Sequence, residues 1–295
     1  RHHYMSLDPY MRGRMNDAKS YAVPQPLGQV MQGGTVGEVV ESRNEKYAVG
    51  DKVVGFGGWQ HYSVVDGNMV GALRKVDTTH VPLSHYLGAV GMPGVTAWYG
   101  LVKIIEPKEG QTVVISAATG AVGSAFGALA KARGCRAVGI AGGPDKCKYA
   151  VDELGFDVCI DYKLHKDAGS LSKALKEACP NGIDGYFENV GGMVLDAVLS
   201  RMNAFGKIAL CGMIAGYDGQ PLPMAYPQLI LTNRLKIQGF IVSEHMEVWP
   251  EALKELGMLV GTGKLRPRES IADGLAAAPE AFLGLLKGKN FGKQL

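Results

Sequence analysis

A glycine-containing turn between an apolar run and a helical segment constrains this chain most. Residues 112–115 are apolar or β-branched, and the segment from residue 121 has helical periodicity. Between them, Ala117, Gly120 and Gly123 form the spacing Ala-x-x-Gly-x-x-Gly. Small residues in a strand–turn–helix unit let the backbone approach a dinucleotide pyrophosphate, whose charge then faces the first helical N–H groups. In a chain with 41 glycines the spacing alone is weak evidence, so the context carries the prediction.

The segments around this turn alternate between short strands and helices. A helix begun by Pro93 comes first. The pattern then predicts strands over 112–116, 136–141, 158–161, 185–188, 207–211 and 235–242. The helices predicted between them cover 121–132, 145–154, 171–178 and 193–202. This alternation predicts an α/β fold with a doubly wound parallel sheet of the Rossmann type.

Residues 1–91 have a different pattern, in which short β-like runs alternate with Gly and Pro. We expect strands from residue 4 and over 34–40, 52–55 and 61–65, hence a β-rich, barrel-like domain over 1–91. The dinucleotide domain is expected over 92–263. The tail, 264–295, is too short for a domain and is expected to return to the first one. Because the chain starts without methionine, we also expect a preceding N-terminal segment.

Charge and cysteine content argue against several classes of function. With 31 basic and 28 acidic residues and a net charge of +3, the chain does not indicate a nucleic-acid or membrane partner. The apolar runs are shorter than the roughly 20 residues of a membrane helix. Five cysteines without Cys-x-x-Cys spacing are expected to be reduced thiols of a cytoplasmic protein.

The end of the second predicted strand indicates which cofactor is bound. Folds that select NAD usually place Asp or Glu there, where it binds the ribose 2′-hydroxyl. Here the strand ends in Ala141-Gly142-Gly143, and Lys146 follows one turn into the next helix. Small residues leave room for a 2′-phosphate and the lysine supplies its countercharge, which favours NADPH over NADH. The alternative is that Lys146 is an ordinary solvated helix lysine.

The histidines and cysteines do not form a metal motif. None of the seven histidines stands in a His-Glu-x-x-His or Cys-x-x-His arrangement, so we expect no metal ligands. Hydride transfer without a Lewis acid suits an activated alkene better than a simple alcohol. In an α,β-unsaturated carbonyl, hydride attacks the β-carbon and charge moves to the carbonyl oxygen, where a hydrogen-bond donor stabilises it.

Several further motifs together resemble a known family. They are Ser-Leu-Asp-Pro-Tyr-Met-Arg (6–12), Gln-Gly-Gly-Thr-Val-Gly (32–37), Gly-Met-Pro-Gly (91–94), Phe-Glu-Asn-Val-Gly-Gly (187–192) and Asn-Phe-Gly-Lys (290–293). With the glycine turn, they resemble the medium-chain dehydrogenase/reductase superfamily, closest to its zinc-free branch of alkenal, prostaglandin, curcumin and leukotriene enzymes. The resemblance implies NADPH, a GroES-like catalytic domain beside the Rossmann domain, an active site in the cleft between them, and usually a homodimer.

The resemblance also implies roles for individual residues. Tyr10 resembles a substrate-pocket tyrosine, although it could instead pack between domains. Asn290 would reach toward the cofactor from the tail. The remaining cofactor contacts would come from Gly120, Ala121, Val122 and Gly123 at the pyrophosphate, Lys146 and Tyr162 at the adenosine phosphate, Asn189 with Cys211, Gly212, Met213 and Tyr217 of the loop 211–217 at the middle, and Phe240, Ile241 and Val242 beside the nicotinamide.

One segment departs from the family pattern. Many relatives carry a tyrosine shortly after the strand equivalent to 240–242, where it bonds the substrate oxygen. This chain has Ser243-Glu244-His245-Met246 there. Ser243 or His245 could substitute, or backbone groups and the cofactor ribose could suffice. Cys211 is expected to be a small buried residue rather than a nucleophile.

The leading prediction is NADPH-dependent reduction of the C=C bond of α,β-unsaturated ketones or aldehydes, without a metal. Two alternatives remain: an NADPH-dependent quinone reductase that uses the same cofactor site, and a non-catalytic NADPH-binding protein. The apolar run 229–242 suits a homodimer contact at the sheet edge. The physiological substrate does not follow from the sequence.

Overall fold

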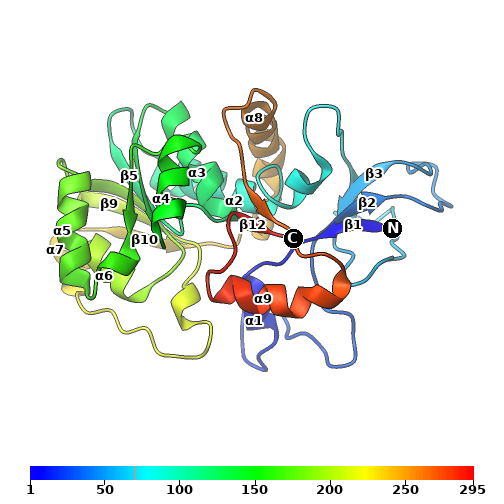
Figure 1. Ribbon diagram of the computed structural model, residues 1–295, viewed down its shortest axis with the longest axis horizontal. Coiled ribbons are helices and arrows are strands. Elements are labelled where there is room, and N and C mark those ends of the chain that lie inside the picture. The colour runs from blue at the N-terminus through cyan, green and yellow to red at the C-terminus, as the bar shows by residue number, and fades with distance from the viewer. Residues whose placement is uncertain (70) are drawn as a thin grey trace. The chain divides into compact units, whose positions relative to one another are not determined.

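The computed structural model describes residues 1–69 and 71–295, which divide into two compact units (Figure 1). The first unit comprises residues 1–91 together with 268–295, and the second comprises residues 92–267. The C-terminal tail therefore belongs to the same unit as the N-terminal segment. Among the described residues, the helices are too short or too polar to cross a bilayer.

The second unit is built on a six-stranded sheet in which all neighbouring strands are parallel. Its order is β10-β9-β8-β5-β6-β7, which confirms the predicted doubly wound Rossmann-type sheet. The strands are β5 (Thr112–Ser116), β6 (Arg136–Ala141), β7 (Val158–Asp161), β8 (Ile183–Glu188), β9 (Met202–Leu210) and β10 (Lys236–Gly239).

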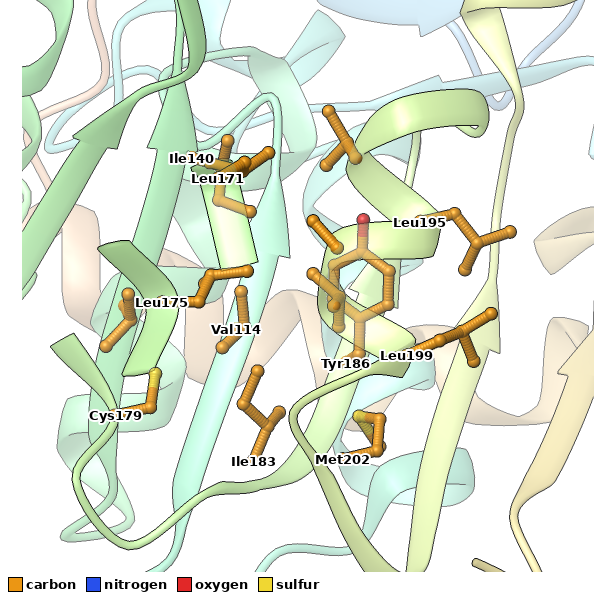
Figure 2. Packing of buried hydrophobic residues seen from close by; sticks show 14 of the residues in the cluster. Val114, Ile140, Leu171, Leu175, Cys179, Ile183, Tyr186, Leu195, Leu199 and Met202 are labelled. Atoms are coloured by element: carbon orange, nitrogen blue, oxygen red, sulfur yellow. The ribbon is translucent and has the colours of Figure 1, made fainter. Parts of the chain in front are cut away.

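Helices cover both faces of this sheet. Leu171 and Leu175 on one helix, with Leu195 and Leu199 on another, pack around Val114 and Tyr186 of the strands (Figure 2). On the opposite face, Gly100 lies so close to Phe187 that an added Cβ would be 2.3 Å from its ring. The helices are α2 (Met92–Tyr99), continued as π-helix over Gly100–Ile105, α3 (Ala121–Ala132), α4 (Pro144–Asp152), α5 (Ala168–Ala178), α6 (Gly192–Leu199), α7 (Gln228–Thr232) and α8 (Trp249–Gly261).

Several predicted boundaries in this unit are wrong, among them that of the fifth strand, which begins at Met202 instead of residue 207. The helix predicted over 193–202 ends at Leu199, because Met202 already pairs with Ile183 as the first residue of β9. The strand predicted over 235–242 ends at Gly239, which pairs with Leu210 at the end of β9. Without a ladder partner beyond that point, residues 240–242 leave the sheet.

The first unit contains a four-stranded antiparallel sheet of order β1-β2-β3-β4, which agrees with the expected β-rich domain. The predicted strand over 61–65 is irregular instead. Side-chain contacts tie it to β1, because the His2 ring bonds Gln60 O and Ser63 Oγ. The elements of this unit are β1 (His2–Met5), α1 (Tyr10–Arg14), β2 (Thr35–Glu38), β3 (Lys52–Gly55), β4 (Leu73–Lys75), β11 (Glu269–Ser270), α9 (Ala278–Leu286) and β12 (Lys293–Gln294).

A buried lysine attaches the tail to the N-terminal segment. The Lys293 side chain is only 3% exposed, and its ammonium donates to Leu7 O (2.9 Å), Asp8 Oδ1 (3.1 Å) and Gln294 O (2.8 Å). Burial lowers the pKa of Lys293, and the neighbouring Asp8 opposes this shift. Helices α1 and α9 lie next to each other (Figure 1), and Met11 and Phe282 belong to one small buried core between them. The ion pair and this small core hold residues 268–295 in the first unit.

Replacing Lys293 by Met is expected to destabilise the first unit by about 3–5 kcal/mol, because it leaves the buried Asp8 carboxylate without its cation. Urea unfolding followed by tryptophan fluorescence measures this loss. Adding Asp8→Leu to Lys293→Met should restore much of the stability. The control Lys287→Met changes an exposed residue. Equal stability of the Lys293→Met and Lys287→Met proteins would show that the ion pair is dispensable.

Candidate functional site

The candidate site lies where the order of the parallel sheet reverses, between β5 and β8. From β5 the chain adds β6 and β7 on one side, and later β8, β9 and β10 on the other. In such sheets, ligands bind outside the carboxyl ends of the strands at this switch point. The residues predicted for the cofactor from the second unit all follow a carboxyl end, namely Gly120–Gly123, Lys146, Tyr162, Asn189, the loop 211–217 and Phe240–Val242.

The glycine turn after β5 is shaped by close backbone contacts. Ala117 has a left-handed φ of 52°, and its carbonyl accepts the Gly120 N–H at 2.9 Å. A Cβ on Gly123 would lie 2.4 Å from Ala117 O, so this position requires glycine. Uncharged residues, beginning with Ala121 and Val122, form the first turn of α3. The helix terminus thus presents its free N–H groups, which suits an anion such as a pyrophosphate.

A buried carboxyl group connects this turn to the loop after β8. Glu188 is fully buried, and its Oε1 accepts the Ser116 hydroxyl at 2.9 Å and the Val190 N–H at 2.5 Å. The Ser116 oxygen in turn accepts the Asn189 N–H at 2.8 Å, while Asn189 Nδ2 donates to Ser116 O at 2.9 Å. Burial raises the pKa of Glu188 above its ordinary value. Sequence reasoning did not identify Glu188, although it lies inside the Phe-Glu-Asn-Val-Gly-Gly motif.

The loop after β9 packs against the loop after β8. Ile214 N–H donates to Asn189 O, and the Met213 side chain would lie 3.2 Å from a Cβ on Gly191. Gly212 lies beneath the Tyr217 hydroxyl, 3.0 Å from an added Cβ. Burial raises the pKa of the Cys211 thiol to about 12, which agrees with the expectation that this cysteine is not a nucleophile.

Two lysines meet where β6 and β7 end. The Tyr162 ring and the Lys163 stem pack over Gly142, 2.9 and 3.0 Å from the position of an added Cβ. Lys146 on α4 is half-buried, and its pKa is lowered by burial and by the neighbouring Lys163 charge. The sequence prediction contained Lys146 and Tyr162 but missed Lys163. A cation directly after a predicted strand end was the available signal.

A carboxylate that sequence reasoning also missed lies in this region. Asp161 pairs in register with Ala141, and its Oδ1 accepts the N–H groups of Gly143 (2.8 Å) and Lys163 (3.0 Å). These bonds fix the turn before α4 and the segment after β7. The backbone amides engage the Asp161 charge, and the two lysines give the region its basic character.

An aromatic cluster lies beyond the end of β10. The Phe240 ring lies 5.3 Å from the Tyr99 ring and 6.0 Å from the Phe187 ring. His245 stacks on Tyr99 at 4.2 Å, and its Nδ1 lies 3.4 Å from Glu247 Oε1. These contacts hold the half-buried imidazole in place, whereas Ser243 is exposed. Of Ser243 and His245, the two residues predicted to substitute for the family tyrosine, His245 is the one whose side chain is oriented by such contacts.

The two candidate residues from the first unit, Tyr10 and Asn290, contact other residues of that unit. Tyr10 begins α1 and packs against the small core around Met11 and Phe282, and burial raises its pKa. Asn290 Nδ2 donates to Gly292 O at 2.7 Å within the tail. Among residues 1–69 and 71–295, no group of three or more His, Cys, Asp or Glu side chains is arranged to hold a metal ion.

Known proteins similar to this chain match it over nearly its full length. A family model described as the N-terminal domain of oxidoreductase matches residues 1–73, and one described as zinc-binding dehydrogenase matches residues 121–257. The NADPH-dependent curcumin reductase of Escherichia coli (strain K12) is 48% identical over 98% of this chain and 84% of its own length. The 2-alkenal reductase (NADP(+)-dependent) of Nicotiana tabacum is 42% identical over 99% of this chain and 84% of its own.

A solved structure is similar to the same extent. The crystal structure of CurA from Vibrio vulnificus in complex with NADPH matches this chain with a TM-score of 0.90 and 47% sequence identity. The match covers 100% of this chain and 87% of that one. Both units therefore have counterparts in a protein that binds NADPH.

Proposed function

Because the chain belongs to the medium-chain dehydrogenase/reductase family, we propose that it is an NADPH-dependent reductase of carbon–carbon double bonds conjugated to a carbonyl group. The observation that carries this proposal is the glycine turn at the switch point, with two lysines after the neighbouring strands. The two similar reductases are named as NADPH-dependent and NADP(+)-dependent enzymes, and the second is a 2-alkenal reductase. We infer a small enone or enal as substrate.

The residues at the switch point fit a dinucleotide. The absence of a Cβ at Gly123 lets the backbone of the turn pack closely against α3, and α3 begins there with uncharged residues. In this proposal Gly120, Ala121, Val122 and Gly123 hold the pyrophosphate. Asn189, fixed by Ser116, and the loop 211–217 line the middle of the cofactor.

Charge at the other end of the site supports the choice of NADPH. Lys146 and Lys163 are close enough for one ammonium to lower the pKa of the other, an arrangement that a phosphate between them would stabilise. We assign the 2′-phosphate to Lys146, Lys163 and Tyr162. Gly142 lies beneath these residues, and a side chain at this position would displace Tyr162.

When bound, NADPH supplies the hydride that the β-carbon of the enone accepts. The chain must then stabilise negative charge on the substrate oxygen and deliver a proton to the α-carbon. We assign the proton donor to His245, because stacking on Tyr99 and the Glu247 carboxylate orient its ring. Phe240, Ile241 and Val242 support the nicotinamide, and Tyr10 and Asn290 remain candidates for substrate and cofactor contacts.

The sheet edge and the free thiols support two further assignments. β10 pairs only with β9 in the described part of the chain, so its outer edge offers unpaired backbone groups to a second copy. We propose a homodimer through this edge, which light scattering of the purified chain tests.

Five free cysteines suit a reducing compartment, and we propose the cytoplasm.

The proposed activity predicts consumption of NADPH with a panel of small enones and enals, followed at 340 nm, and a saturated carbonyl product identified by mass spectrometry. Turnover with NADH should be much slower. Turnover of quinones without enone reduction would instead indicate a quinone reductase. Tight NADPH binding with neither activity would indicate a non-catalytic binding protein.

Replacing Lys146 by Ala is expected to raise the KM for NADPH about tenfold or more, because a hydrogen bond to a charged group contributes about 1.5–3 kcal/mol. The more exposed Lys163 should contribute less, so Lys163→Ala is expected to raise that KM about two- to fivefold. Both variants should leave the KM for NADH nearly unchanged. The matched control is Lys148→Ala on the same helix, where the ammonium pairs with Asp152. Equal losses with NADH would contradict the assignment.

Replacing His245 by Phe preserves an aromatic ring on Tyr99 but removes the proton-bearing nitrogens. With enone substrate we expect kcat to fall about 100-fold, the lower range for loss of a general acid, while the dissociation constant for NADPH stays unchanged. Stopped-flow kinetics and cofactor fluorescence separate the two effects. If Ser243→Ala lowers kcat and His245→Phe does not, the serine is the donor and the assignment is wrong.

A further inference from the structure

Helix α8 follows the aromatic cluster of the site in the chain, and a carboxylate holds it against α2 and α3. Glu255 on α8 accepts the Trp98 indole N–H at its Oε2, at 2.7 Å. The Arg133 guanidinium, just after α3, donates to the same carboxylate through two nitrogens, at 2.8 and 3.0 Å. The Trp98 side chain is only 1% exposed. The proposed activity uses none of these three side chains.

The charge of Glu255 makes this contact specific. Burial raises the pKa of Glu255, but the hydrogen bonds from Arg133 and Trp98 outweigh it and lower this pKa on balance. The group is therefore a carboxylate at neutral pH, and both of its oxygens are occupied by donors. A bidentate pair of this kind adds geometric specificity to the packing of the buried Ala252 and Leu256 on the same helix.

Two consecutive aromatic residues of α2 connect this contact to the site. The Trp98 indole bonds Glu255, while the next side chain, Tyr99, stacks on His245 with the ring centroids 4.2 Å apart. The π-helical segment Gly100–Ile105 begins directly after this pair, and such segments are frequent at functional sites. One turn of α2 thus holds both the middle of α8 and the histidine that precedes this helix.

A second bond ties the beginning of α8 to the turn that carries the histidine. Trp249 is the first residue of α8, and its indole N–H donates to Val242 O at 3.3 Å. The same carbonyl accepts the His245 N–H at 3.2 Å. Because Val242 is buried, a displacement of α8 would reach the backbone of residues 242–245 through this carbonyl.

We propose that Glu255 and Trp249 are positioning residues that hold the His245 ring in place for proton transfer, an inference that rests on the proposed function. The ring depends on such support because its contact with Glu247 is weak: that carboxylate is 69% exposed, and exposed ion pairs contribute little. Stacking on Tyr99 is the stronger restraint, and it requires that α8 and α2 keep their spacing. Neither Glu255 nor Trp249 is assigned a contact with substrate or cofactor.

Replacing Glu255 by Ala is expected to lower kcat with an enone about tenfold, since a small displacement of the proton donor is costly, and to leave the dissociation constant for NADPH unchanged. In the His245→Phe background the same change should cause no further loss, because its effect passes through the imidazole. Glu255→Gln, which keeps an acceptor for Trp98, should retain most of the kcat. The matched control is Glu251→Ala, an exposed position on the same helix. An equal fall of kcat in both backgrounds, or an equal loss in Glu255→Gln, overturns the proposal.

Proton NMR of the full chain measures the ring contact itself, without cofactor or substrate. The ring current of Tyr99 shifts the His245 ring protons upfield, and the signal that disappears in His245→Phe identifies them. At the same pH, Glu255→Ala should move this signal downfield, as should Trp249→Phe, a milder change that keeps a ring and removes the N–H. An unchanged signal in both variants overturns the proposal, and Trp249→Phe decides alone if Glu255→Ala does not fold. If the unchanged protein reduces no enone, the proposed function fails, while the NMR signal still decides whether α8 positions the ring.

Discussion

The hydrogen bond between Ser116 and the buried Glu188 is the contact on which the candidate site depends. It joins the last residue of β5 to the last residue of β8, the two strands between which the sheet order reverses. From these two strand ends the chain continues into the glycine turn and into the Asn189 loop. Because Ser116 also bonds the Asn189 backbone and side chain, both loops are fixed to one pair of polar groups. A buried polar network of this kind stabilises a specific geometry as long as its members find partners.

Those parts of the site that depend on local backbone chemistry could be predicted from the sequence. The strand bounds at 112–116, the helix at 121–132 and the glycine requirement at Gly123 follow from short-range patterns of β-branched and small residues. The basic position at Lys146 followed from the same logic, since a strand end and the next helix turn are close in sequence. In both cases the residues that decide the structure are close together in the sequence.

Features that depend on distant partners could not be predicted in this way. The strand β10 ends at Gly239 because its neighbour β9 ends at Leu210. The apolar run that continues to Val242 gives no sign of this limit. In the sequence, nothing distinguishes Glu188 from a surface carboxylate. Only the fold places Ser116 beside it. Lys163 belongs to the basic region only because β6 and β7 are adjacent. Helices α8 and α9 were not predicted.

The attachment of the tail has a consequence for the order in which the chain folds during synthesis. Residues 92–267 leave the ribosome complete, with every strand of the parallel sheet present. The first unit, by contrast, still exposes Leu7 and Met11 until α9 and Lys293 arrive, because these residues supply the other half of its small core and its buried cation. Domains generally fold as units as they emerge, N-terminal first. Here we expect the reverse order, in which residues 92–267 fold first and the N-terminal residues 1–91 complete their core only when residues 268–295 have been made.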